Sequence, residues 1–117
     1  MALEQAIIDL ESAVESSATA AATETTIRER LQRVRAMMAE PLKSRDGWLV
    51  ARAEHADRDR CALLERISSM TKRISESALT SGTLTELRRL AHDLTRYQQR
   101  VHDLDYDAVE LELGGFD

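Results

Sequence analysis

The chain has 117 residues, of which 43% are hydrophobic, 32% are charged and only 3% are aromatic. This composition is too apolar for a disordered chain, and its apolar runs are shorter than the ~20 residues that span a bilayer. The acidic N-terminus lacks the basic start of a secretory signal, and Cys61 is the only cysteine, which excludes an internal disulfide. We therefore expect one soluble, cytoplasmic domain with an aliphatic core, as in helical bundles.

Charge divides the chain into three blocks. Residues 1–27 carry five acids and no base, residues 28–102 carry 16 bases and 10 acids, and residues 103–117 carry six acids and no base. Segregated charge of this kind favours contacts between blocks, either within one chain or between chains. The pattern indicates that the acidic C-terminal block is a contact segment, but it does not identify the partner.

The first predicted helix spans residues 3–40. Its apolar residues recur every three or four positions on both sides of a weak centre at 16–26: Leu3, Ile7, Leu10 and Val14, then Ile27, Leu31, Val34 and Met38. The centre is either Ala-rich helix or a joint, because Thr26 and Glu29 match a capping box that could start a new helix. We favour one continuous helix that ends before Pro41.

A second helix is predicted over residues 46–79, after a connection from Pro41 to Gly47. One seam of this helix advances in alternating steps of four and three residues, which is the heptad signature of coiled-coil packing: Leu49, Ala53, Ala56, Arg60, Leu63, Ile67, Met70 and Ile74. Only Arg60 interrupts the apolar seam.

A third helix is predicted over residues 83–104, with Thr83 and Glu86 as its capping box. Its apolar face consists of Leu87, Leu90, Ala91, Leu94, Val101 and Leu104. These three elements predict an all-α fold, an antiparallel three-helix bundle or coiled coil over residues 1–104. Self-association is expected, because the shorter third helix cannot cover the whole seam of the second unless the first helix or another copy helps.

Residues 105–117 are predicted to form a short acidic interaction tail. Val109, Leu111 and Leu113 alternate with acids, which is the period of a half-buried strand, whereas Asp107 and Glu110 could instead cap a helical turn. Neither form is stable alone, so we expect the tail to be ordered only when it docks on the body or on a partner.

The sequence offers little support for catalysis or metal binding. No Glu precedes a His by three residues, as carboxylate di-iron bundles require, and the three histidines are scattered. His55 and Asp59 are expected to form a surface contact rather than a metal site. Cys61 is expected to be a small buried residue rather than an activated thiolate. We therefore expect no enzyme activity, no cofactor and no metal.

The Arg-rich centre of the chain raises the possibility of nucleic-acid binding. The chain has 14 Arg and two Lys, but acids are interleaved with these bases, and this pattern is typical of an ion-paired helix face. No aromatic platform for base stacking accompanies them. An Arg-rich nucleic-acid-associated regulator is therefore an alternative that we rank below protein binding.

Trp48 is the only tryptophan in the chain. It either covers the end of the core or anchors a partner, as Trp often does at binding hot spots. The order Trp48, Glu54, Arg58, Leu63, Leu64 loosely resembles that in small helical chaperones of the flagellar export system, with spacings that differ by a residue or two. This resemblance implies a chaperone or adaptor as the alternative to a scaffolding module.

The sequence thus predicts a non-catalytic helical protein that self-associates and binds a protein partner. The expected partner-binding residues lie at the start of the second helix and in the tail: Trp48, Val109, Leu111, Leu113 and Phe116.

Overall fold

The computed structural model describes residues 2–16, 20–77 and 79–114, and in these residues all regular secondary structure is helical. The elements are α1 (Ala2–Glu15), α2 (Ala20–Met37), the short 3-10 helix η1 (Gly47–Leu49), α3 (Val50–Glu76) and α4 (Ser81–Gly114). The predicted all-α class is confirmed, but the boundaries of the helices differ from those expected.

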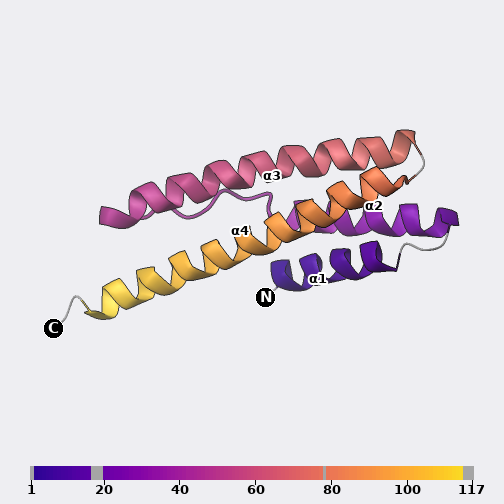
Figure 1. The fold of residues 1–117 in the computed structure, drawn as a ribbon. Coiled ribbons are helices and arrows are strands. Elements are labelled where there is room, and N and C mark those ends of the chain that lie inside the picture. Colours follow the sequence, from indigo (N-terminus) through magenta and orange to yellow (C-terminus); the bar gives the residue numbers. More distant parts are fainter. Residues whose placement is uncertain (1, 17–19, 78, 115–117) are drawn as a thin grey trace.

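The four α-helices run antiparallel to their neighbours in the chain (Figure 1). Helix α1 packs on α2 and α4, and α3 packs on the same two helices from the other side, so each helix has two helical neighbours. Because α3 and α4 are longer than α1 and α2, the molecule is elongated and measures 59 × 21 × 20 Å. At one end α3 and α4 continue beyond the N-terminus of α1 (Figure 1).

The prediction of one continuous helix over residues 3–40 is wrong. The chain forms two separate helices here, α1 and α2, which pack against each other. The phase of the apolar stripes explains this result, because on one straight helix the stripes that end at Val14 and start at Ile27 would point roughly 120° apart at 3.6 residues per turn. As a hairpin, both stripes are buried in the same core. Of the run 16–26, residues 17–19 lie outside the described part of the chain.

Both predicted capping boxes are also wrong. Thr26 lies inside α2 and therefore does not start a helix. Helix α4 starts before Thr83, because the hydroxyl oxygen of Thr80 accepts a hydrogen bond at 3.1 Å from the backbone N–H of Thr83. Thr80 thus satisfies an early amide of the helix in the way an N-cap residue does. Glu86 forms an ion pair with Arg73 of α3 instead of capping.

The expected boundary between a third helix and a tail at residue 104 does not exist. Helix α4 continues to Gly114, which excludes the strand alternative for residues 105–114. It has 34 residues against 27 in α3, so the mismatch in length on which the self-association argument depended is absent. Two contacts hold the extended part of α4 in place, namely the ion pairs of Asp105 with Arg45 and of Asp107 with Arg52.

The predicted seam of α3 is buried along its whole length. The main core contains buried apolar residues from all four helices, including Leu63 and Ile67 of α3. A second, smaller cluster lies where α3 and α4 extend beyond α1, and it joins Leu49 and Ala53 to Leu104, with Ala108 packed against them.

Arg60, the polar member of the seam, is only 7% exposed and binds the end of α2. Its Nη1 donates to the carbonyl oxygens of Met38 at 3.0 Å and Ala39 at 3.4 Å, and its Nε donates to Oδ1 of Asp57 at 2.9 Å. The same carboxylate oxygen accepts from the backbone N–H of Leu42 at 3.4 Å. A cation at the carbonyl end of a helix complements the helix dipole, so Arg60 holds both α2 and the connection that follows it against α3.

We expect Leu63→Ala and Ile67→Ala to lower the free energy of unfolding by about 2–5 kcal/mol each, because both side chains are buried in the main core. Chemical denaturation followed by circular dichroism measures this loss. Ile8→Ala is the matched control, since Ile8 is 45% exposed and its truncation should change stability by less than about 0.5 kcal/mol. Equal effects of the core and control variants would contradict the assigned core.

We expect Arg60→Ala to lower the free energy of unfolding by about 1–3 kcal/mol, because it removes the donor to two helix-end carbonyls and one of the two donors to the Asp57 carboxylate. Arg58→Ala on the exposed side of α3 is the control.

The hydrogen bond from Arg60 lowers the pKa of Asp57. A carboxyl group whose pKa is lower in the folded state stabilises the fold above its unfolded pKa of about 4, and this stabilisation is lost as the pH falls through the folded value. Asp57→Asn should therefore destabilise the protein at pH 7, and the difference in the free energy of unfolding between wild type and variant, measured by chemical denaturation, should shrink as the pH falls through the lowered pKa of Asp57.

Candidate functional site

The end of the molecule where α3 and α4 extend beyond α1 differs from the rest of the bundle (Figure 1). We call this region the open end and define it as residues 40–56 and 103–110. Here α3 and α4 pack on each other through the small cluster of Leu49, Ala53, Leu104 and Ala108. The connection that follows α2 lies alongside the two helices, tied to α3 by the backbone N–H of Leu42 and to α4 by Arg45.

Two interhelical ion pairs position the acidic part of α4 in the open end. Arg52 Nη1 of α3 lies 2.7 Å from Oδ2 of Asp107, and Arg45 of the connection pairs with Asp105. These carboxylates point to opposite sides of α4, one toward α3 and one toward the connection. The extended helix is therefore held on two sides by arginines, which explains why it does not end at residue 104 as expected.

Exposed apolar side chains gather at the open end. The described residues include six large hydrophobic side chains that are exposed, and four of these belong to the open end: Trp48, Val50, Tyr106 and Val109. The other two, Ile8 and Met37, lie on α1 and α2. Single exposed hydrophobic residues are common on proteins, whereas groups of them are typical of binding surfaces, so the open end is the candidate site.

Trp48 belongs to this exposed group, so the interpretation that it covers the core is wrong. Its side chain is 61% exposed, and its neighbour Leu49 fills the buried position instead. The guanidinium carbon of Arg52 lies 5.8 Å from the centre of the indole ring, a cation–π distance. Because Arg52 also binds Asp107, the exposed indole is connected to α4 through one arginine.

Of the predicted tail residues, the structure places Val109 on the surface of α4, where its side chain is 54% exposed. Leu111 and Leu113 are in helical backbone, but their side chains lie outside the described part of the chain, as does Phe116. Tyr106 is exposed beside Val109 and was not predicted. Its hydroxyl bonds Glu110, one turn further along the helix, and this hydrogen bond raises the pKa of Tyr106.

An open groove of about 450 Å³ runs between the connection and α4 in the open end. Its α4 side is formed by Val101, Leu104, Ala108 and Val109, together with Asp105. The opposite side is formed by residues 40–43 and Arg45. The groove therefore combines apolar side chains with charged ones at its rim, a composition common at protein-binding surfaces.

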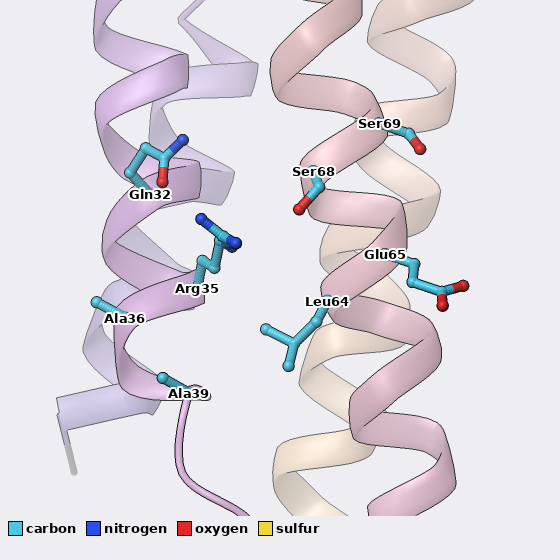
Figure 2. Close-up of a pocket in the computed structure, with 8 residues that line it drawn as sticks. All are labelled: Gln32, Arg35, Ala36, Ala39, Leu64, Glu65, Ser68 and Ser69. Carbon is cyan, nitrogen blue, oxygen red and sulfur yellow. The ribbon is translucent and has the colours of Figure 1, made fainter.

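A second groove, of about 850 Å³, lies between α2 and α3 in the body of the bundle (Figure 2). Figure 2 shows Arg35 and Leu64 pointing into the gap between the two helices, whereas Glu65 points away from it. The rest of its lining consists of Ala, Ser and Gln side chains. Leu64 is the one large apolar side chain in this lining, whereas the open end exposes four, so this groove is a weaker candidate than the open end.

The reactive side chains considered from the sequence are dispersed. His55 Nε2 lies 3.8 Å from Oδ2 of Asp59, which also pairs with Arg100, so the carboxylate is engaged in surface contacts. Cys61 is exposed, contrary to the expectation that it is buried, and its sulfur lies 3.8 Å from Nη2 of Arg60. Within the described ranges, no three His, Cys, Asp or Glu side chains are grouped to hold a metal ion.

Comparison of the chain with protein families, with curated proteins and with solved structures found no match in any of the three. None of the helices in the described part of the chain is long and apolar enough to cross a membrane. Any function assigned to the chain therefore rests on the geometry and chemistry of its own side chains.

Proposed function

We propose that the chain is a non-catalytic helical interaction module that binds a protein partner at its open end. The observation that carries this proposal is the gathering of Trp48, Val50, Tyr106 and Val109 at one end of the molecule. In the described part of the chain, four helices surround the core of the body, whereas the open end consists of two helices and a connection. Apolar side chains without a helical neighbour are what a partner helix requires for docking.

The architecture suits a scaffold or adaptor because the binding surface is fixed before the partner arrives. The two arginine pairs hold α4 in position, and the small cluster beneath them joins α3 to α4. Binding of a partner would therefore carry little entropic cost for ordering this surface, and such preorganisation raises affinity. A small chaperone would bind its client at the same surface. The chaperone alternative therefore predicts the same binding site and differs only in what happens to the bound protein afterwards.

The distribution of arginines favours protein binding over nucleic-acid binding. Several arginines of the central block are paired with acids of a neighbouring helix: Arg33 with Asp9, Arg66 with Asp93, Arg73 with Glu86 and Arg100 with Asp59. Such pairs neutralise the charge that would bind a phosphate backbone. The exposed aromatic residues also lie in the open end, where acids of α4 would repel nucleic acid.

We expect the double variant Trp48→Ser/Val109→Ser to lose its partners while remaining folded, because both side chains are exposed. Loss of one hot-spot anchor costs about 2 kcal/mol or more, roughly a thirtyfold loss of affinity. The tagged full-length chain and its variants are used to enrich proteins from a lysate of the source organism, and the captured proteins are quantified by mass spectrometry.

The matched control is Ile8→Ser/Met37→Ser, which removes the two exposed hydrophobic side chains outside the open end. The proposal requires that proteins captured by the wild type are kept by this control and lost by the open-end variant. If both variants capture the same proteins as the wild type, the open end does not bind a partner.

A further inference from the structure

The charge of α4 reverses along its length. Residues 81–102 carry the bases Arg88, Arg89, Arg96 and Arg100 against two acids, whereas residues 103–114 carry five acids and no base. Helix α1 covers the first of these stretches and is itself purely acidic, with four acids and no base in Ala2–Glu15. The protein thus already contains one example of how α4 is covered, namely by an apolar-striped helix of opposite charge.

The face of α4 that contacts α1 continues into the open end. Thr95 marks this face, because its hydroxyl donates to Oε1 of Glu11 at 2.9 Å. His102, Tyr106 and Val109 follow Thr95 by 7, 11 and 14 residues, spacings that return to the same side of an α-helix. Tyr106 and Val109 are 60% and 54% exposed, so α1 does not cover their side chains.

Acids border this exposed face. Asp105 lies on the side of the connection, where it pairs with Arg45, and Asp103 and Glu110 lie on the other side. Among the described residues, Asp103 and Glu110 interact only with polar side chains of α4 itself, Gln99 and Tyr106. The charges of Asp103 and Glu110 therefore remain available to a partner that binds the same face of α4 as α1 does.

Resting on the proposed function above, we propose that the partner contributes a basic amphipathic helix, which lies on α4 in line with α1 and packs its apolar stripe on Tyr106 and Val109. The stretch from Asp103 to Gly114 has 12 residues, about 18 Å of helix at 1.5 Å per residue, so the contact takes three to four turns of the partner. Lys or Arg residues beside the apolar stripe then meet Asp103 and Glu110.

The charge pattern argues against a second copy of this chain as the occupant. Symmetric pairing of two open ends places the acidic stretch of one α4 against that of the other, and like charges at short distance oppose association. The most basic helix of the chain, α2, buries its apolar stripe of Ile27, Leu31 and Val34 in its own core. It is therefore not free to dock on another molecule.

Two synthetic peptides test this inference on the full-length protein. Both have about 14 residues and the same stripe of Leu and Ala, but one carries Lys and the other Glu at the remaining positions. Calorimetry measures affinity, and amide chemical-shift changes locate the site. We expect the Lys peptide to bind and to cause chemical-shift changes concentrated in residues 40–46 and 103–110. Its affinity should fall as the salt concentration rises, because salt screens exposed charges. The Glu peptide should not bind.

Variants separate specific docking from general attraction of a cation to an acidic protein. Tyr106→Ser/Val109→Ser, which leaves the charge unchanged, should weaken the Lys peptide by roughly tenfold or more, because it removes apolar area from the contact. Ile8→Ser is the matched control on acidic α1 and should leave the affinity unchanged. Asp103→Asn/Glu110→Gln should weaken binding several-fold and reduce its dependence on salt.

Equal binding of both peptides, shifts that concentrate on α1, or no binding of the Lys peptide would overturn the inference. So would a dimer in sedimentation that Tyr106→Ser/Val109→Ser dissociates, since the open end would then bind a second copy. These results are distinguishable from failure of the proposed function. If the open-end variant still loses its captured partners, the open end binds proteins but not through a basic helix.

Discussion

The hydrogen bonds of Arg60 determine where the four-helix body ends and the open end begins. By binding the carbonyl oxygens of Met38 and Ala39, Arg60 holds the end of α2 against the middle of α3. Its partner Asp57 then binds the backbone of Leu42, so the chain after α2 follows α3. The connection can therefore place Arg45 beside Asp105, and that ion pair helps to hold the extended part of α4. The exposed surface at the open end depends on this series of contacts.

The sequence correctly predicted burial where one helix face is apolar along its whole length. The seam of α3 is buried as predicted, even at Arg60, because its heptad spacing fits a long helix with neighbours on one side. A joint between α1 and α2 was one of the two alternatives, but a continuous helix was favoured although the shift of phase between Val14 and Ile27 was visible in the sequence. The signal for α4 at Thr83 was only three residues late, since Thr80 has the same capping chemistry.

The extension of α4 could not be predicted in the same way, because contacts between distant residues stabilise it. Arg45 and Asp105 are 60 residues apart, and Arg52 and Asp107 are 55 residues apart. The local sequence pattern alternates the apolar residues Val109, Leu111 and Leu113 with acids, and this alternation also fits a strand. The three-residue spacing of Tyr106 and Val109 predicts that they share one face of a helix. Whether that face is exposed depends on where α1 lies, which the local sequence does not reveal.

The acidic charge on the last part of α4 disfavours the docking of a second acidic helix at the open end. An acidic helix such as α1 is attracted to the basic stretch that it covers and is repelled by the stretch that begins at Asp103. An α1 helix from another copy, exchanged between molecules, would meet the same repulsion at the open end. The acids around Tyr106 and Val109 therefore disfavour α1 as an occupant of the open end and favour a basic helix of the kind proposed.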